Sequence, residues 1–480
     1  MFLKDYYPNL NKKFNKVKFK GLAFNSKLIK KDYIFFAIKG NKDDGSKYIG
    51  EAIKRGSKII ISDRNKKILN KNEVLYLINK NPRKLLAEFA TKLNKKRPNN
   101  IIAVTGTNGK SSIANFYHQI LNINKIKSSS IGTLGIKGVN LKKKIINTTF
   151  DPIQLNQSLK ILKIKRINNV ILEASSHGLK QNRLDGLKFN IGIFTNLSRD
   201  HLDYHKTFKD YLNSKLILFK KLMKKKSYII FDNDQYISSK LKNISKIHNI
   251  KTLSIGSKNS NLKVIDHNYL NLNQKVKFIF NRKIFSFSTG LIGKVQIKNI
   301  LMSILAAYKS NISLKKILNS IPKIKPIHGR LEKIGKLKNN SIVILDYAHT
   351  PDALKVCLEN IREQFKLRKI NLVFGCGGER DKPKRKIMGI IANNYCNKVY
   401  LTDDNPRNEN PKKIRRSIIK GCKKKAIEIA NRSKAIKTAI NELKSNQLLL
   451  VAGKGHEQTQ NYGNKIVTFS DKKLIKATTN

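Results

Sequence analysis

Short apolar runs recur along this chain, and each is followed by a polar or glycine-bearing loop and then by helix-like sequence. Four such runs lie in the last third, at residues 342–345, 370–374, 399–401 and 448–451. A strand covered on both faces is apolar throughout, and alternation of strands with helices joins neighbouring strands in parallel. The pattern therefore predicts an α/β fold in which helices cover both faces of parallel sheets. Ligands in such folds bind beyond the carboxyl ends of the strands, where the polar loops of this chain stand.

The chain divides into three blocks, and a length of 480 residues allows about two to four domains. Residues 1–98 contain short β-rich runs and end in a lysine- and asparagine-rich stretch that is typical of a linker. Residues 99–325 open with the strand-like run 101–104, a glycine loop and a segment with apolar residues at helical spacing. Residues 326–480 hold the four runs named above. We therefore expect three domains with these bounds.

The formal net charge of +68 would ordinarily suggest a nucleic-acid partner. The lysines are spread along the whole chain, however, and they accompany many Asn and Ile residues and no Trp. AT-rich codons would produce this combination without any polyanion. We expect no specific nucleic acid, although a substrate with phosphates and carboxylates would still be attracted to such a surface.

The sequence also bears on the location of the protein. No stretch approaches the roughly 20 apolar residues of a membrane span, so no membrane insertion is expected. The first residues lack the basic-then-apolar layout of a secretory signal. The four cysteines form no Cys-x-x-Cys pair, which disfavours a zinc or redox site, and unpaired thiols fit a reducing cytoplasm. We expect a cytoplasmic protein that acts as a monomer.

A glycine loop, Thr-Gly-Thr-Asn-Gly-Lys-Ser at residues 105–111, stands between an expected strand and an expected helix. Glycines let backbone N–H groups close around phosphate oxygens, and the helix N-terminus adds positive potential. Lys110 would reach the outer phosphates, and the Ser111 hydroxyl would ligate Mg²⁺. The general phosphate-loop pattern requires glycine where this chain has Val104, so a simple glycine turn is the alternative. The strand–turn–helix context favours a nucleotide loop.

Further segments share a family pattern with this loop. They are Glu-Ala-Ser-Ser-His-Gly-Leu at 173–179, Thr-Asn-Leu-Ser-Arg-Asp-His-Leu-Asp-Tyr-His at 195–205, Asp-Tyr-Ala-His-Thr-Pro-Asp at 346–352, Phe-Gly-Cys-Gly-Gly-Glu-Arg-Asp-Lys at 374–382, Asp-Asn-Pro-Arg at 404–407 and Gly-Lys-Gly-His-Glu at 453–457. From about residue 24 to the end, the chain resembles the Mur ligases, which build the peptide stem of peptidoglycan. Within that family it is most similar to the ligases that add the third residue to UDP-N-acetylmuramoyl-L-alanyl-D-glutamate.

The resemblance implies an ATP-dependent amide ligase with a three-domain architecture. The first domain would bind the UDP end of the substrate, the central phosphate-loop domain would bind ATP, and a C-terminal Rossmann-like domain would bind the incoming amino acid. ATP would phosphorylate the D-glutamate carboxylate, and the amine of the amino acid would then displace phosphate. The implied nucleotide-binding residues are Gly106, Thr107, Asn108, Gly109, Lys110, Ser111, Ser112, Asn299, Arg330, Asp346 and His349.

The same resemblance implies a catalytic group made of Lys110, Glu173, His201 and Lys215. Ser111 would hold one Mg²⁺, Glu173 and His201 would bind a second, and Lys215 would be carbamylated to support a metal ion. Judged by spacing alone, Glu173 could equally be a capping carboxylate and His201 a hydrogen-bonded histidine in a turn. A solvated lysine is the default interpretation of Lys215 within a helix.

The implied substrate residues fall into two groups. Those for the sugar-peptide are Phe24, Ser26, Asn147, Thr148, Thr149, Ser175, Gln181 and Arg183, although Arg183 could also be a surface arginine. Those for the amino acid are Arg380, Asp404, Asn405, Pro406, Arg407, Gly453 and Glu457. The chain departs from the family at Asn25, Lys27 and Gln296, where Asp, Arg and Asn are usual.

Two arginines and a carboxylate suit an amino acid with a second carboxylate, and we expect meso-diaminopimelate. Arg380 and Arg407 can each pair with a carboxylate, Asn405 can both donate and accept, and Glu457 could hold an ammonium. The alternatives are an L-lysine-adding relative, a folylpolyglutamate synthetase-like ligase of the same superfamily, and a basic nucleic-acid-dependent ATPase.

Overall fold

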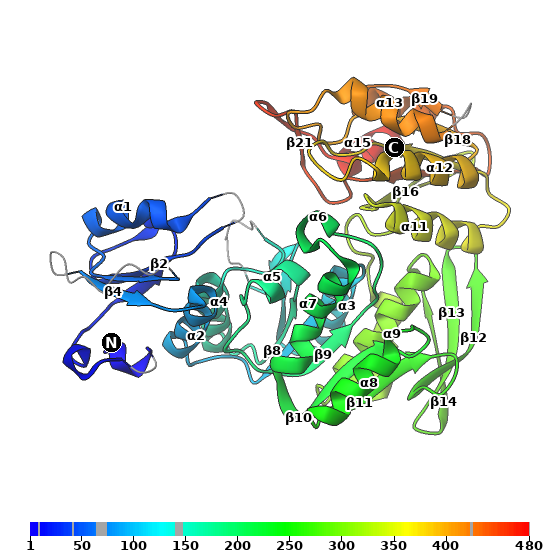
Figure 1. Cartoon of the computed structure of the whole chain (residues 1–480). Coiled ribbons are helices and arrows are strands. Elements are labelled where there is room, and N and C mark those ends of the chain that lie inside the picture. The colour runs from blue at the N-terminus through cyan, green and yellow to red at the C-terminus, as the bar shows by residue number, and fades with distance from the viewer. Residues whose placement is uncertain (8–9, 41–42, 64–73, 140–146, 423–425, 480) are drawn as a thin grey trace.

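The computed structural model describes the chain except for residues 8–9, 41–42, 64–73, 140–146, 423–425 and 480, and it leaves out the side chains of 202–203. Three sheets follow one another along the chain, together with one small hairpin. Figure 1 shows the N-terminal unit at the left, the central unit in the middle and the C-terminal unit above it. No helix among the described residues is long and apolar enough to cross a membrane.

The N-terminal unit is a parallel four-stranded sheet in the order β1-β2-β3-β4. Its elements are β1 (Gly21–Ala23), β2 (Tyr33–Ala37), α1 (Ile49–Lys54), β3 (Ile59–Ser62), β4 (Leu75–Ile78) and α2 (Pro82–Leu93), with short 3-10 turns before and between them. Because successive side chains of a strand point to opposite faces, Ile34 and Phe36 pack toward α2, and Phe35 packs toward α1. The apolar runs at the start of the chain are therefore strands, as predicted.

The central sheet has ten strands in the order β14-β13-β12-β11-β10-β9-β5-β8-β6-β7. The strands are β5 (Asn100–Thr105), β6 (Ser128–Gly132), β7 (Gly135–Lys137), β8 (Asn169–Glu173), β9 (Phe189–Phe194), β10 (Met223–Asp232), β11 (Lys251–Gly256), β12 (Leu262–Leu270), β13 (Asn273–Phe280) and β14 (Lys283–Thr289). The helices are α3 (Lys110–Ile123), α4 (Pro152–Ile164), α5 (Ser176–Lys180), α6 (Leu202–His205), α7 (Phe208–Lys221), α8 (Ser238–Ile247), α9 (Lys294–Tyr308) and α10 (Leu314–Ser320).

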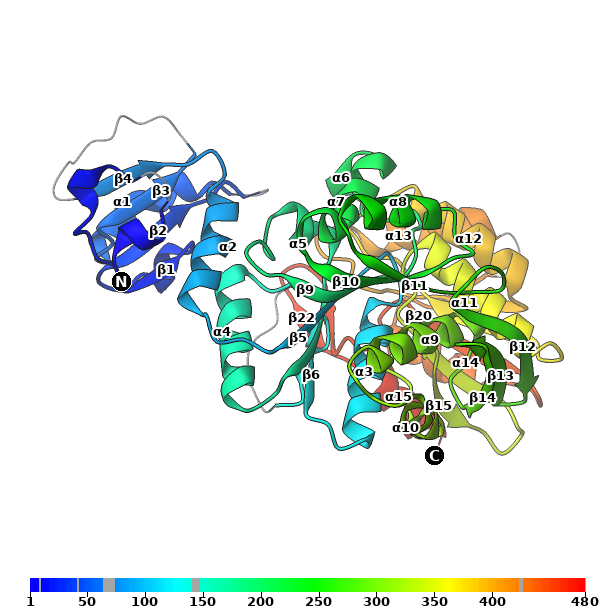
Figure 2. The ribbon, with the colours of Figure 1, turned by 90° about the horizontal axis from the view of Figure 1, so that it is seen from below.

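Helices cover both faces of the central sheet, as predicted for a parallel sheet (Figure 2). In β5, Ile102 and Val104 join a core with α3 and α9, whereas Ile101 and Ala103 join a core with α4, α7 and α8. The seven neighbouring strands β6-β8-β5-β9-β10-β11-β12, in sheet order, run parallel, and β5 lies between β8 and β9. The carboxyl ends of β5, β8 and β9 therefore meet at one edge.

The antiparallel extension formed by β12, β13 and β14 was not predicted from the sequence. Its strands alternate exposed and buried residues, with Val276, Phe278 and Phe280 of β13 buried among lysines. The apolar side covers the sheet core at its edge, and the lysine side faces solvent. A search for uniformly apolar runs passes over strands of this kind, because only one of their faces is buried.

The C-terminal unit is a six-stranded sheet in the order β15-β16-β20-β17-β18-β19, parallel except for the edge strand β15. The four apolar runs of the sequence are β16, β17, β18 and β20, as predicted. Helices α11, α12 and α13 cover one face and α14 and α15 the other. The elements are β15 (Glu332–Lys336), β16 (Ile342–Asp346), α11 (Pro351–Gln364), β17 (Ile370–Phe374), α12 (Lys384–Tyr395), β18 (Lys398–Leu401), α13 (Pro411–Cys422), β19 (Ala426–Glu428), α14 (Arg432–Asn441), β20 (Leu448–Ala452), the hairpin strands β21 (Thr459–Asn461) and β22 (Ile466–Thr468), and α15 (Asp471–Thr479).

Candidate active site

The glycine loop joins β5 directly to α3, in the strand–loop–helix geometry that the sequence predicts. Gly106 and Gly109 have φ values of 143° and 85°, which side-chain-bearing residues rarely adopt. A Cβ atom on Gly106 would lie 1.9 Å from Thr195 Oγ1. The two glycines are therefore required by the backbone and by the close approach of the next loop.

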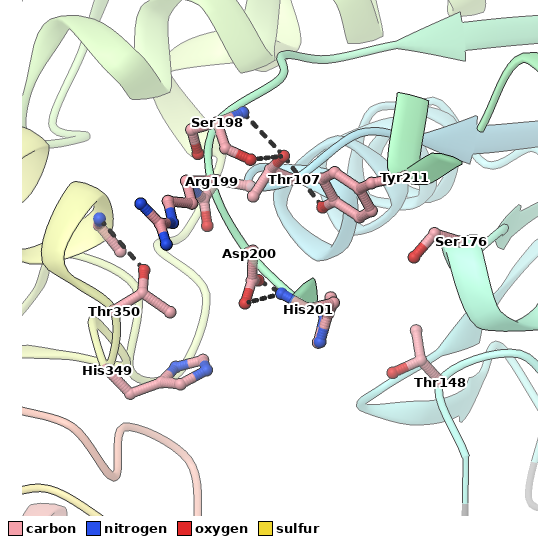
Figure 3. A network of polar contacts seen from close by, with 12 residues as sticks. Thr107, Thr148, Ser176, Ser198, Arg199, Asp200, His201, Tyr211, His349 and Thr350 are labelled. Carbon is pink, nitrogen blue, oxygen red and sulfur yellow. Dashed lines mark hydrogen bonds and ion pairs between the residues drawn. The ribbon is translucent and has the colours of Figure 1, made fainter. Parts of the chain in front are cut away.

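That next loop, residues 195–201 after β9, holds the glycine loop in place. The backbone N–H of Thr107 donates to the Asn196 carbonyl at 2.9 Å, and that of Asn108 donates to Asn196 Oδ1 at 2.9 Å. The Thr107 hydroxyl accepts from the Ser198 N–H at 3.0 Å and from the Tyr211 hydroxyl at 3.1 Å (Figure 3). The glycine loop and the 195–201 loop are thus hydrogen-bonded to each other at the carboxyl edge of the sheet.

Two lysines converge on the glycine loop. Lys110 Nζ donates to the carbonyls of Gly106 and Thr107 at 3.0 and 2.7 Å. Lys215, on α7, donates to the same Gly106 carbonyl at 2.6 Å, and it is only 1% exposed. Burial lowers the pKa of Lys110, and burial together with the charge of Lys110 lowers the pKa of Lys215 well below its ordinary value. The solvated-lysine interpretation of Lys215 is therefore wrong.

Glu173 is the last residue of β8 and is buried at the same edge of the sheet. Its Oε1 accepts from the Thr133 N–H at 3.0 Å, and its Oε2 accepts from the Thr133 hydroxyl at 3.1 Å. A Cβ atom on Gly132 would come within 2.2 Å of Glu173 Oε1, so the glycine makes room for the carboxylate. Each carboxylate oxygen retains lone-pair capacity for a further partner.

His201 lies in the loop after β9, with its backbone in the left-handed region at φ 53°. Its Nε2 lies 3.4 Å from Asp200 Oδ2, and its ring meets that of His177 edge-on at 4.8 Å. Burial would raise the pKa of Asp200, but the charges of His201 and His349 lower it below its ordinary value. Asp200 was not singled out from the sequence, although it stands beside His201 in a quoted segment.

The implied adenine-side residues form a connected group between α9 and the C-terminal unit. Asn299 Nδ2 donates to Gln296 Oε1 at 3.0 Å, and Gln296 Nε2 donates to the Arg330 carbonyl at 3.3 Å. Asn299 Oδ1 also lies 2.6 Å from the place of a Gly109 Cβ, so this group packs against the glycine loop. The longer Gln296 side chain is thus buried and bonded.

Asp346 ends β16 beneath this group. It accepts from the N–H groups of Leu331 and Ala348, both at 2.7 Å, and burial raises its pKa. The Arg330 guanidinium lies over the Tyr347 ring, 4.5 Å from its centre. Burial lowers the pKa of His349. This segment therefore brings the predicted Arg330, Asp346 and His349 together.

A cavity of about 390 Å³ lies between the central and C-terminal units. Its wall includes His201, His349, Arg380, Asp404, Asn405, Arg407, Gly453 and Glu457, all singled out from the sequence, and also Asp200 and Lys384, which were not. In Figure 3, Asp200 and His201 project from the central unit on the side where His349 stands. The glycine loop and Lys215 are not on this wall, but the glycine loop contacts the 195–201 loop that contributes to it, and Lys215 contacts the glycine loop. The expected amino-acid residues other than Pro406 thus line one cavity with His201.

The loops that carry the two cavity arginines are tied together behind the wall. Arg385 makes a bidentate pair with Glu409, at 2.6 Å to Oε1 and 2.7 Å to Oε2. These bonds lower the pKa of Glu409 to about 2. Arg407 Nη1 donates to the Gly378 carbonyl at 2.7 Å. The loop that carries Arg380 and the loop that carries Arg407 are therefore fixed relative to each other.

The expected sugar-peptide residues lie beside Glu173. The Thr149 hydroxyl donates to the Glu173 carbonyl at 2.9 Å and lies 2.9 Å from the Ser175 hydroxyl. Thr148 Oγ1 is 3.1 Å from Thr133 Oγ1, and Asn147 begins this stretch. Arg183 donates to Gln181 Oε1 at 2.6 Å and to the Thr149 carbonyl at 2.6 Å, so it is not a free surface arginine.

The expected uridine-end residues lie apart from these, in the N-terminal unit. The Ser26 hydroxyl donates to Glu51 Oε2 at 2.7 Å, and the Asn25 side chain caps the short turn that follows it. Phe24 and Lys27 are exposed. None of these side chains reaches the cavity, which fits a substrate that extends away from the site of chemistry.

Family models match the chain over nearly its whole length: the Mur ligase family catalytic domain at 18–93, the Mur ligase middle domain at 104–307, and the Mur ligase glutamate ligase domain at 329–455. A relative from Rickettsia montanensis is 39% identical over 475 residues, which cover 98% of this chain and 97% of the relative. The chain belongs to the Mur ligase family. It is therefore an ATP-dependent acid–amino-acid ligase, and the resemblance read from the motifs is confirmed.

That relative and one from Buchnera aphidicola subsp. Schizaphis graminum, 38% identical over 95% of this chain and 94% of its own length, are named UDP-N-acetylmuramoyl-L-alanyl-D-glutamate--2,6-diaminopimelate ligase. A solved structure with the same name matches at a TM-score of 0.72 and 26% identity, covering 100% of this chain and 98% of that one. A MurF ligase from Thermotoga maritima in complex with ADP shares the fold, with a TM-score of 0.63 at 18% identity over 96% of both chains.

Proposed function

We propose that this ligase joins meso-2,6-diaminopimelate to UDP-N-acetylmuramoyl-L-alanyl-D-glutamate, with ATP converted to ADP and phosphate. The observation that carries the proposal is the cavity beside His201, whose wall combines Arg380, Arg407, Asn405 and Glu457. The names of the near-full-length relatives support the same pair of substrates. We propose that the reaction takes place in the cytoplasm, because it uses ATP and a UDP-linked substrate, and that the enzyme is a monomer that needs no nucleic acid.

The first step is phosphoryl transfer. An oxygen of the D-glutamate side-chain carboxylate attacks the γ-phosphorus of ATP, ADP leaves, and an acyl phosphate forms. The glycine loop and Lys110 hold the phosphates, because the helix N-terminus and the ammonium offset their charge. Asn299 and Arg330 approach the nucleotide from α9 and the C-terminal unit.

In the second step the amine of diaminopimelate attacks the acyl carbon. Phosphate leaves with the electron pair of the broken C–O bond, and the amine gives up a proton as the amide forms. Arg380 and Arg407 hold the distal carboxylate, and Asn405 and Glu457 orient the amino acid so that its amine faces the acyl group. Thr149, Ser175 and Arg183 orient the D-glutamate part. Holding two reactants in this way supplies much of the rate enhancement.

The residues fit Mg²⁺ as a companion of ATP. Ser111 offers a hydroxyl, Glu173 a carboxylate with spare lone pairs, and His201 an imidazole nitrogen. Mg²⁺ prefers oxygen ligands and usually completes its shell with phosphates and water. Within the described part of the chain, no three His, Cys, Asp or Glu side chains form a ready-made metal group. Bound Mg²⁺ would offset the negative charge of the transferring phosphoryl group.

Lys215 suits the carbamylation that we propose for it. Carbon dioxide adds to a neutral amine, and burial beside Lys110 favours the neutral form of Lys215. Intact-mass measurement in bicarbonate should show the mass gain of one CO₂, which Lys215→Ala abolishes together with most activity. An unmodified wild type combined with a fully active Lys215→Ala variant would remove this role.

The decisive experiment measures ADP release with UDP-muramyl-dipeptide and ATP in the presence of meso-diaminopimelate, L-lysine or glutamate. We expect turnover with meso-diaminopimelate and little with the other two. Preferred use of L-lysine would overturn the choice of amino acid. Turnover that depends on nucleic acid and not on the muramyl peptide would overturn the proposed function as a whole.

A further inference from the structure

Lys454 lies behind the cavity wall and is fully buried. Its Nζ donates to Glu457 Oε2 at 2.9 Å and to Asn405 Oδ1 at 3.1 Å. Asn405 Nδ2 donates to the same Glu457 oxygen at 2.9 Å, which closes a triangle of three side chains. Asn405 and Glu457 lie on the cavity wall, whereas the buried ammonium of Lys454 does not line the cavity.

The orientation of the Asn405 amide is fixed by the backbone. The N–H of Asn461, in β21, donates to Asn405 Oδ1 at 2.9 Å, and a backbone N–H can only donate. With Lys454 on the same oxygen, the acceptor side of the amide is occupied, and the remaining capacity of Asn405 is an N–H. The expectation that Asn405 both donates and accepts toward the ligand is corrected: it offers only a donor, which suits a carboxylate.

The charge of Glu457 is offset by the same lysine. Burial would raise the pKa of Glu457, but the charge and hydrogen bond of Lys454 lower it below its ordinary value, so the carboxylate is ionised and paired. A paired carboxylate can still accept a hydrogen bond, yet its pull on a free cation is weaker because the ammonium beside it opposes that pull. Arg380 and Arg407, on the same wall, can therefore attract a carboxylate with less opposition from Glu457.

We propose that Lys454 is a specificity-determining positioning residue, which makes the cavity select an amino acid with a distal carboxylate over one whose distal end carries an ammonium alone. It acts through Asn405, which it helps to hold as a donor, and through Glu457, whose charge it offsets. The inference rests on the proposed function, since it concerns which amino acid that reaction takes.

The test replaces Lys454 with methionine, which has similar length and no charge. We expect the KM for meso-diaminopimelate to rise by about tenfold or more, while the KM values for ATP and UDP-muramyl-dipeptide stay within about twofold. The ratio of kcat/KM for meso-diaminopimelate to that for L-lysine should fall by about tenfold, because the loss of the buried positive charge and of its hydrogen bond to Asn405 weakens the binding of the distal carboxylate, which L-lysine lacks. Lys454→Arg, which keeps the charge, should keep most of this ratio.

Lys398→Met is the matched control, since it removes a half-exposed lysine–carboxylate pair with Glu442 on the same sheet, away from the cavity. Equal losses for both amino acids in Lys454→Met, with the ratio unchanged, would show a merely structural role and overturn the proposal. If circular dichroism shows Lys454→Met to be unfolded, Lys454→Gln takes its place. A kcat/KM ratio that falls equally in Lys454→Arg would also overturn the proposal. A wild type that uses neither amino acid would refute the proposed function instead.

Discussion

Arg432 and Asp471 form a fully buried ion pair whose disruption has a calculable effect. Arg432 Nε donates to Asp471 Oδ1 and Nη2 to Oδ2, both at 2.8 Å, and Nη2 also donates to the Ala452 carbonyl at 2.9 Å. The pair joins the first residue of α14, the first residue of α15 and the last residue of β20. The loop that carries Gly453 and Glu457 begins directly after this junction.

Replacing Arg432 with methionine leaves the Asp471 carboxylate buried in the core without its ion-pair partner. Both side chains are 0% exposed, so the full cost of an unpaired buried charge applies, about 3–5 kcal/mol in the free energy of unfolding. At about 2–4 °C per kcal/mol for a unit of this size, the C-terminal unit should melt roughly 6–20 °C earlier. The double variant Arg432→Met, Asp471→Leu removes both charges and should recover most of the loss.

Urea unfolding at pH 7, followed by circular dichroism, measures these differences. Lys398→Ala is the exposed comparison, and it should cost no more than about 1 kcal/mol because half-exposed pairs contribute little. A loss below about 1 kcal/mol in Arg432→Met would refute the reasoning. A double variant as unstable as Arg432→Met would also refute the reasoning. The loss of stability would then come from lost packing and not from the unpaired charge of Asp471.

Two further predictions concern the site. Glu409→Gln should destabilise the C-terminal unit at pH 7, because the pKa of Glu409 is lowered from 4.5 to about 2 in the folded protein. The difference in the free energy of unfolding from wild type, measured by urea titration, should be constant above about pH 5 and vanish as the pH falls from 4.5 toward 2. A difference that grows on acidification would contradict the pairing with Arg385. Gly132→Ala should displace Glu173 and lower kcat by about tenfold or more in the ligase assay, whereas Gly50→Ala, whose Cβ meets nothing within 4 Å, should not.

The sheets could be predicted because strands buried on both faces consist of consecutive apolar residues. The runs at 101–104, 342–345 and 448–451 are apolar throughout, and each is a strand in the structure. The β12–β14 extension escaped because its apolar side chains alternate with lysines. The pattern of Val276, Phe278 and Phe280 between lysines and polar residues was the signal that could have revealed it.

The site was predictable as a set of motifs, but its internal contacts were not. Lys215 and Gly106 are more than a hundred positions apart, so nothing local indicated that the lysine is buried against the glycine-loop carbonyl. The same holds for Lys454 and Asn405, which meet because β20 and β18 deliver their following loops to one edge of the sheet. A lysine between two glycines ordinarily indicates solvent exposure, so the sequence gives no sign that Lys454 is buried.

The cavity beside His201 is lined by residues of the central and C-terminal units, which have separate hydrophobic cores. The N–H of Arg199, in the central unit, donates to Asp352 Oδ2 of the C-terminal unit at 3.0 Å. A ligand bound there would contact both units and would therefore stabilise their association. A nucleotide bound where we propose, between the glycine loop and Arg330, would also contact both units, at a different place. Each ligand thereby lowers the cost of bringing the units together for the other, and by thermodynamic reciprocity each raises the affinity of the other by the same factor.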